Sequence, residues 1–233
     1  MITFRTVVRS LPLLSVFLVA GTAGRAQSPE ITATQMFSLG PGYSGGATVS
    51  VDPALYWLVF PVYSYRFGLD ATYPITPVVD ATLGMGVERR AAGFRWFQET
   101  SVWEKRAVNY LTFSPGINIS ALHLGFDIGV PTGGTRTWRN GPDARVNESD
   151  LDPDADSLNV LLEPCIGAVI PVYDNRIGWL GVTIMAGYAL NNMSEHFMFS
   201  PGQEVDRVIR NTGTFSLRIG LTGQIGIPGT ARE

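Results

Sequence analysis

The chain has little of several residue types that soluble secreted proteins use. It holds one cysteine, Cys165, among 233 residues, so an internal disulfide is impossible. Small secreted domains often depend on disulfides, so this protein must be stabilised in another way. Lysine also occurs only once, at Lys105. Because the exterior of a soluble protein normally carries many charged side chains, this scarcity argues against an ordinary water-facing surface.

Long hydrophobic runs and an excess of basic residues are missing as well. The apolar run at 11–20 is shorter than the roughly 20 residues that a membrane-spanning helix needs. The formal net charge is −3. This argues against nucleic acid as a partner, because nucleic-acid-binding proteins have basic surfaces. If the protein enters a membrane, strands must cross it.

The N-terminus has the layout of an export signal. Arg5 and Arg9 precede the apolar run, and the small residues of "GTAGRA" at 21–26 follow it. This order is typical of a secretory signal peptide that is cleaved. We therefore expect a signal peptide over 1–26, cleaved after Ala26 or Ala23, and an N-terminal segment over 27–44.

The rest of the chain shows the periodicity of strands. Between 62 and 227, apolar residues recur at every second position in one segment after another, as in "TFSLRIGLTGQIGI" at 214–227. Successive side chains of a strand point to opposite faces, whereas a helix would repeat every three to four residues. Seven such strands are clear. We interpret 91–105, 131–157 and 191–212 as long loops.

The connections between these strands alternate between short and long. The short ones are "PITP" at 74–77, Ser120-Ala121 and "YDNR" at 173–176. Antiparallel neighbours place alternate connections at opposite ends, so one more strand must precede Tyr63. Both "GGATVSV" at 45–51 and "ITATQMFSL" at 31–39 fit that place. We predict an all-β fold, a closed antiparallel up-and-down transmembrane β-barrel of eight strands over 45–227, with a C-terminal tail over 228–233.

The apolar rows are predicted to face lipid. Each is long enough for a tilted membrane-spanning strand of about 9–11 residues, and the opposite rows hold Gly, Ser, Thr, Asn and isolated charges. Outer-membrane barrels have an apolar exterior and a polar interior. Aromatic residues near strand ends predict interfacial belts. They are Trp57, Tyr63, Tyr73, Trp96, Trp103, Trp179 and Phe215.

One sequence segment supports an outer-membrane barrel. "NYLTFSPGINIS" at 109–120 is similar to a strand and turn of the outer membrane protein β-barrel domain of Bacteroidetes-like bacteria, and 45–227 resembles the small eight-stranded outer-membrane barrels. The resemblance implies an outer-membrane location, short periplasmic turns and long external loops. It also implies outer-membrane lipid, lipopolysaccharide and the barrel-assembly machinery as partners, with a further, unidentified partner at the loops. The chain departs from many such barrels because it continues into "PGTARE" instead of ending on an aromatic residue.

Eight ionisable side chains fall on the predicted inner face. They are Arg66, Asp70, Asp80, Glu88, His123, Asp127, Glu163 and Arg218. Eight strands leave an interior just wide enough for side chains to fill, and buried charges are costly unless they are paired. We therefore expect a network of ion pairs. In it, Arg66 lies diagonally near Glu88 across the "PITP" turn, and Arg218 pairs with Glu163 or Asp127.

Two further features of the sequence bear on possible sites. Asp150, Asp152, Asp154 and Asp156 alternate like the first ligands of a calcium loop. The glycine and the terminal glutamate of that loop are missing, so we interpret the stretch as a solvated external loop. Cys165 is expected to be a small core residue facing the lumen. No metal, cofactor or catalytic residue is assigned.

The sequence predicts a structural or surface-interaction role through the long external loops, without enzymatic activity. Three alternatives stay open. The barrel can pass small solutes or ions, it can be a lipid-modifying enzyme with His196 as the best catalytic candidate, or it can be a secreted soluble barrel that binds an apolar ligand.

Overall fold

The computed structural model describes residues 37–51, 57–96, 101–174, 177–191, 193 and 213–227. The expected signal peptide over 1–26, the candidate His196 and the expected tail over 228–233 lie outside the described residues. Among the residues that are described, no helix is long and apolar enough to span a membrane.

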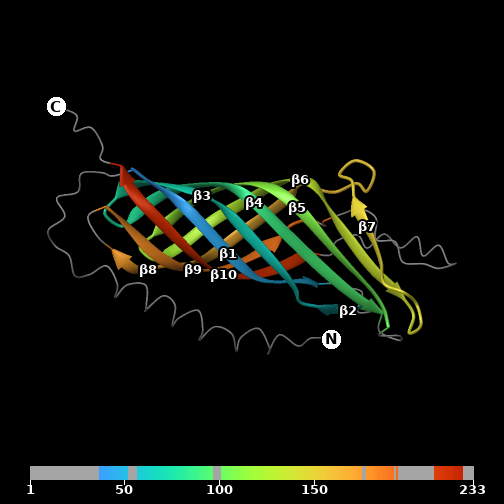
Figure 1. The fold of residues 1–233 in the computed structure, drawn as a ribbon. Coiled ribbons are helices and arrows are strands. Elements are labelled where there is room, and N and C mark those ends of the chain that lie inside the picture. The colour runs from blue at the N-terminus through green and yellow to red at the C-terminus, as the bar shows by residue number, and fades with distance from the viewer. Residues whose placement is uncertain are drawn as a thin grey trace.

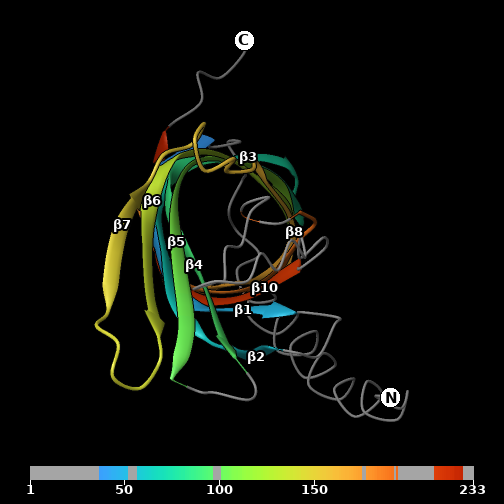
Figure 2. The same cartoon turned by 90° about the vertical axis from the view of Figure 1, so that its right-hand side faces the viewer.

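Eight strands form a closed barrel. They are β1 (Phe37–Val51), β3 (Val62–Thr76), β4 (Val79–Trp96), β5 (Val102–Ile119), β6 (Leu122–Asn140), β8 (Leu161–Asp174), β9 (Gly178–Ala189) and β10 (Gly213–Ile227). Each pairs antiparallel with the next, and β10 pairs with β1 from Phe37↔Ile227 to Val51↔Gly213, which closes the ring (Figure 2). The predicted eight-stranded up-and-down barrel is confirmed.

Two short strands extend this wall at one end. β2 (Trp57–Phe60) pairs with the end of β4, and β7 (Asn147–Leu151) pairs with the end of β6. Figure 1 shows this end, the loop end, on the right and the turn end on the left, where the strands are joined closely. At the turn end, Pro77 and Val78 join β3 to β4, and Ser120 and Ala121 join β5 to β6. The backbone N–H of Ser120, at φ 55°, donates to the carbonyl of Val78 at 2.8 Å.

Three strands are longer than expected. The predicted loops at 91–105 and 131–157 are wrong in part, because β4 continues to Trp96, β5 begins at Val102 and β6 continues to Asn140. Proline usually ends pairing inside a sheet because it has no N–H to donate. Here the register shifts beside Pro131, and Gly133 takes a φ of 127°, which favours glycine. This β-bulge lets β6 pass the proline and continue beyond the barrel wall.

The first strand also begins earlier than the expected barrel start at 45. β1 covers all of "GGATVSV" and the end of "ITATQMFSL", so both candidate segments contribute to it. Its Gly40-Pro41-Gly42 stretch interrupts the alternation and hides the continuity of the strand in the sequence.

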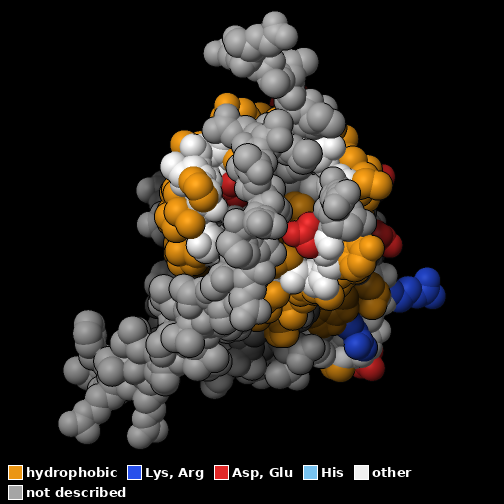
Figure 3. Space-filling model, turned by 90° about the vertical axis from the view of Figure 1, so that its left-hand side faces the viewer, with side chains coloured by type: hydrophobic (Ala, Val, Ile, Leu, Met, Phe, Trp, Pro, Cys, Tyr) orange, Lys and Arg blue, Asp and Glu red, His pale blue; other side chains and the backbone are white. Residues whose placement is uncertain are grey.

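The apolar rows lie on the outside of the barrel, as predicted. In β10, Leu217, Ile219 and Leu221 are 48%, 60% and 61% exposed, whereas Ser216 and Arg218 are 1% and 2% exposed. The view onto the turn end shows hydrophobic side chains around the periphery (Figure 3). An exterior of this kind is stable in lipid and would be a large unpartnered apolar surface in water.

Aromatic side chains mark both ends of the apolar exterior. Those exposed at the loop end are Tyr63, Tyr65, Tyr188 and Phe215, and those at the turn end are Phe37, Tyr73 and Tyr173. From Tyr63 to Tyr73 the chain rises about 33 Å along β3, which is roughly 25 Å along the axis at a tilt of about 40°. This equals the apolar band of an outer-membrane barrel, about 25 Å tall.

Two residues expected on the outer face lie inside. Leu158 is buried because β8 begins only at Leu161, so strand alternation does not apply to it. Trp179 lines an interior cavity, because Leu180, its neighbour in β9, takes the lipid-facing position. The side chains of Trp57 and Trp96 are outside the described ones.

Candidate functional site

The middle of the lumen is filled by ion-paired side chains from five strands. We call Arg66, Glu88, Arg90, Asp127, Glu163 and Arg218 the central cluster. Its three carboxylates are buried, with residue exposures of 2% at Glu88, 1% at Asp127 and 0% at Glu163. Three guanidinium groups balance these three carboxylates. Alternation places all six side chains on the inner face, at neighbouring levels of β3, β4, β6, β8 and β10.

Arg218 joins the three carboxylates. Its Nη2 lies 2.8 Å from Asp127 Oδ2 and 3.4 Å from Glu163 Oε1, and its Nη1 lies 3.4 Å from Glu88 Oε2. Both expected partners, Glu163 and Asp127, are therefore in contact with it. Ser216 adds a hydroxyl that donates to Glu163 Oε1 at 2.7 Å.

The expected diagonal pair of Arg66 with Glu88 is wrong. The two residues are direct partners in the β3–β4 register, but the Arg66 guanidinium reaches Asp127 at 3.1 Å and Asp70 at 3.7 Å. The Glu88 carboxylate is instead held by Arg218 and by Arg90, whose Nη2 lies 2.9 Å from Glu88 Oε1. Arg90 also pairs with Glu163.

Sequence reasoning missed Arg90 because the alternation along this segment was followed only to Glu88, close to the loop expected from 91. The alternation of Asp80, Glu88 and Arg90 in β4 is visible once the strand is known to continue. Arg90 is completely buried.

An apolar layer lies on the loop side of the central cluster. Ala92 follows Arg90 on the inner face of β4, and Leu161 precedes Glu163 on β8. The whole layer consists of Ala92, Val108, Tyr110, Leu151, Leu158, Leu161, Ala189 and Met193. It contains no ionised group, so a hydrated ion moving along the axis would have to lose its water there.

A second, smaller set of charges lies beyond this layer. We call Glu104, Arg106 and Arg136 the loop-end cluster. Glu104 Oε1 lies 2.5 Å from Arg106 Nε and 2.9 Å from Arg136 Nε, and Arg136 also packs over the Trp138 ring at 4.7 Å. Burial lowers the pKa of the Arg106 guanidinium from its ordinary value, and the Glu104 carboxylate acts in the opposite direction. Glu104 and Arg136 lie within the segments predicted as loops, 91–105 and 131–157, and Arg106 directly follows the first of these segments.

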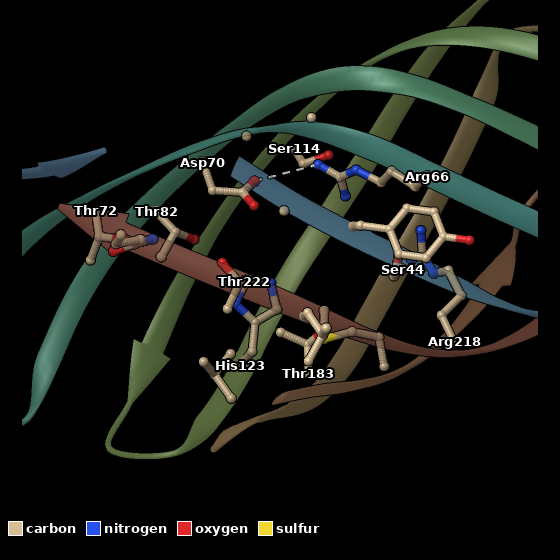
Figure 4. Close-up of a pocket in the computed structure, with 18 of the residues that line it drawn as sticks. Ser44, Arg66, Asp70, Thr72, Thr82, Ser114, His123, Thr183, Arg218 and Thr222 are labelled. Carbon is tan, nitrogen blue, oxygen red and sulfur yellow. Dashed lines mark hydrogen bonds and ion pairs between the residues drawn. The ribbon is translucent and has the colours of Figure 1, made fainter. Parts of the chain in front are cut away.

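A cavity of about 100 Å³ lies on the turn side of the central cluster. Arg66, Asp70, His123 and Arg218 line it, together with several hydroxyl side chains (Figure 4). His123 Nδ1 forms a 2.7 Å hydrogen bond with Asn118 Oδ1. Asp80 is buried near this end, at the start of β4.

The acidic stretch at 147–157 forms β7 and the turn after it. The carboxylate of Asp152 accepts hydrogen bonds from the backbone N–H groups of Asp154 and Ala155, and that of Asp156 accepts one from the N–H of Asp152. These carboxylates therefore stabilise the turn. No group of three or more His, Cys, Asp or Glu side chains in the described part of the chain is arranged to hold a metal ion.

Comparison with known proteins gives similarity of fold only. No protein-family model matches the chain, and no curated protein sequence matches it. Solved structures do match. The Ail attachment invasion locus protein of Yersinia pestis has a TM-score of 0.42 at 10% identity over 82% of this chain and 99% of its own.

Two further structures are similar at 10% identity. Neisserial surface protein A matches with a TM-score of 0.37 over 80% of this chain and 95% of its own. The outer membrane protein OprG from Pseudomonas aeruginosa matches with a TM-score of 0.29 over 82% of this chain and 93% of its own.

The class of protein follows from this chain's own topology and surface. A closed antiparallel barrel with close turns at one end, an apolar exterior between two aromatic belts and an ion-paired interior defines an outer-membrane β-barrel.

Proposed function

We propose that the protein is an integral protein of a bacterial outer membrane that acts by surface interaction and not by catalysis. The barrel is its anchor, and the loop end is its interaction surface. The exterior carries this proposal, because a row such as Leu217, Ile219 and Leu221 is more than two-fifths exposed along its whole length. A closed barrel also satisfies the backbone hydrogen bonds that lipid cannot.

The wall at the loop end supports an interaction role. β4, β5 and β6 continue past the aromatic belt, and β2 and β7 widen them into a sheet (Figure 1). The two edges of this extension are thus partly covered, which protects it from unspecific strand pairing. A rigid, raised sheet of this kind suits contact with a partner outside the cell.

Lipopolysaccharide is the lipid partner that the outer face supports. The apolar rows of β4 and β5 end at Arg89, which donates to Asn109 Oδ1 at 3.4 Å and to Thr135 Oγ1 at 2.8 Å. Lys105 follows on the same face of β5, two alternate positions beyond Asn109. Arg89 and Lys105 lie at the level where the lipid tails end and the phosphate-bearing headgroups begin. Their positive charges form favourable contacts with the phosphates. We also propose the barrel-assembly machinery as a partner, since every such barrel must be inserted into the membrane.

The alternatives find less support. Passage of solutes has to cross both the central cluster and the apolar layer, which fill the lumen. A lipid-modifying enzyme rests on His196, which lies outside the described residues. A soluble barrel with an apolar ligand inside is contradicted, because the apolar rows are on the outside and the interior holds the ion pairs.

Membrane fractionation followed by gels of unboiled and boiled samples tests the location. We expect the protein in the outer-membrane fraction, with a compact band that shifts only on boiling, because SDS does not open a closed barrel at room temperature. A soluble periplasmic protein without a band shift would contradict the proposal.

Labelling of single cysteines tests which end is outside. In a Cys165→Ser background, Glu148→Cys on β7 is expected to react with a membrane-impermeant maleimide on intact cells. Val78→Cys at the turn end is the matched control and should react only after the outer membrane is permeabilised. The reverse pattern would place the loop end in the periplasm and overturn the interaction role.

A further inference from the structure

Three side chains with soft donor atoms meet on the inner wall at the turn end. Cys165 stands opposite Gly125 in the β6–β8 register, and His123 and Met185 stand on either side of Gly167 in the next inward row. A β-carbon built at Gly125 would lie 2.6 Å from Nε2 of His123 and 2.9 Å from Sγ of Cys165. The imidazole nitrogen and the thiol therefore converge on the same space, which exists because residue 125 has no side chain.

The imidazole is oriented as a metal ligand would be. Its Nδ1 lies 2.7 Å from Asn118 Oδ1. An amide oxygen only accepts, so Nδ1 carries the proton and Nε2 is left with its lone pair. Nε2 is the ring atom nearest to the space beside Gly125, where the Cys165 thiol also lies. Metal-binding histidines characteristically donate their other N–H to such an oxygen, which fixes the tautomer and the ring orientation.

A thioether completes the set. The Sδ of Met185 lies against Gly167, close to the place that a β-carbon there would take. Met185 and His123 both line the turn-end cavity (Figure 4 labels His123). Methionine has three rotatable bonds, so its sulfur can move toward the other two donors at little cost. Only two of these three ligands, His123 and Cys165, belong to the residue types His, Cys, Asp and Glu that were considered for a metal site above. The third ligand is a methionine thioether.

We propose that Cys165, His123 and Met185 bind one soft monovalent cation, Cu(I) in the cell. Thiolate, thioether and imidazole form the ligand set that suits Cu(I), and a hard cation such as Mg²⁺ or Ca²⁺ prefers oxygen. On binding, the Cys165 thiol releases its proton to water and a Cu–S bond forms, with no change in oxidation state.

Charge balance favours a monovalent ion over a divalent one. One thiolate and one Cu(I) together are neutral, so the ion pairs of the neighbouring central cluster keep their balance. Zn²⁺ bound by the same single thiolate would add one net positive charge to a cavity whose described lining holds two guanidinium groups, of Arg66 and Arg218, and one carboxylate, of Asp70. Uncompensated charge inside a barrel is costly.

A competition titration tests the proposal on the full mature protein, without a polyhistidine tag, in detergent micelles. Anaerobic Cu(I) is supplied from a chromogenic Cu(I) chelator. We expect one Cu(I) per barrel and no comparable binding of Zn²⁺. The Cys165→Ser variant should bind more than about 100-fold more weakly, since even outer-shell changes cost about 10–100-fold. The Asn118→Ala variant loses only the oxygen that orients the imidazole, so it should bind Cu(I) about 10–100-fold more weakly.

Matched controls exist in the chain. Met185→Leu is expected to weaken binding, and Met85→Leu on the lipid face, where Met85 is 58% exposed, should not. His123→Ala should weaken it, and His196→Ala, which changes the second of the two histidines, should not. Each variant is first shown to keep the heat-dependent band shift, so loss of folding is recognised separately.

Two results would overturn the site. One is undiminished Cu(I) binding by folded Cys165→Ser, and the other is Zn²⁺ binding as tight as that of Cu(I). Sulfur and nitrogen neighbours in the X-ray absorption spectrum of the copper-loaded barrel would support it, and an all-oxygen shell would contradict it. The assay needs neither the membrane location nor a loop partner, so its outcome is independent of the proposed function.

Discussion

The two charged clusters of the lumen are built differently. The central cluster draws its side chains from β3, β4, β6, β8 and β10, so its ion pairs cross the inside of the barrel. The loop-end cluster draws its three side chains from β5 and β6, which are neighbours already held by their backbone ladder. The central cluster thus links strands around the circumference, whereas the loop-end cluster reinforces one strand pair.

This difference sets how much each cluster contributes to stability. A side chain that joins several strands is held in place by all of them, and its loss leaves partners buried without water. Arg136 of the loop-end cluster keeps 19% of its side chain exposed, so water can replace a lost partner there. The largest effects of mutation are therefore expected in the central cluster.

Arg218→Met is the strongest test of the central cluster. It removes the guanidinium from three buried carboxylates, and breaking a buried pair in this way costs about 3–5 kcal/mol. We expect a large fall in the temperature at which the compact gel band unfolds, and in the urea midpoint in lipid vesicles. Arg89→Met on the outer face is the matched control, because the partners of Arg89 among the described residues, Asn109 and Thr135, are both uncharged. An equal loss of stability in Arg218→Met and Arg89→Met would contradict the conclusion that mutations in the central cluster have the largest effects.

Part of this arrangement could be predicted from the sequence. Alternation within expected strands placed Arg66, Glu88, Asp127, Glu163 and Arg218 on the inner face, because a strand fixes which side chains share a face. Particular pairings could not be predicted, since they depend on barrel closure and on competition for each carboxylate. Arg66, for example, reaches Asp127 because Arg90 and Arg218 occupy Glu88.

The loop-end cluster was invisible in the sequence for another reason. Glu104, Arg106 and Arg136 lie in stretches where polar and apolar residues are mixed on both faces, since the extension has no lipid on one side. Without an apolar row the period of two disappears. The bulge at Gly133 further shifts the phase of β6, so alternation counted from Asp127 fails beyond it.

Gly187→Ala tests how tightly the central cluster is packed. A β-carbon at Gly187 would fall on the Glu163 carboxylate, which Arg90, Arg218 and Ser216 hold in place. Filling occupied space in a packed interior costs about 2 kcal/mol. We expect a clear loss of thermal stability by the same gel assay. Gly223→Ala is the control, because its nearest atom is a Leu180 methyl group at 3.5 Å, an ordinary contact. A stable Gly187→Ala barrel would show that the cluster can rearrange.

Glu104→Gln tests the loop-end cluster at its buried member. The amide keeps one acceptor oxygen for Arg106 or Arg136 but removes the charge that both guanidinium groups share. A hydrogen bond to a charged group contributes roughly 1.5 kcal/mol at the lower end of its range, so the expected loss is about that size. Urea unfolding in vesicles measures it. A loss as large as that of Arg218→Met would show that both clusters support the whole barrel.

Arg136→Met should have the smallest effect, and it separates charge from packing. Arg136 is partly exposed, so its pair with Glu104 is expected to contribute only about 0.2–1 kcal/mol, as surface ion pairs do. Its contact over the Trp138 ring, at 4.7 Å, can be taken over by the methionine side chain, because a thioether also packs well on aromatic rings. The stability of this variant should therefore depend little on salt, whereas the intact protein should lose the small electrostatic part as salt rises. Urea midpoints at low and high salt measure both. If Arg136→Met unfolded as readily as Arg218→Met, a pair confined to neighbouring strands would matter as much as one that crosses the lumen, and the distinction between the two clusters would be wrong.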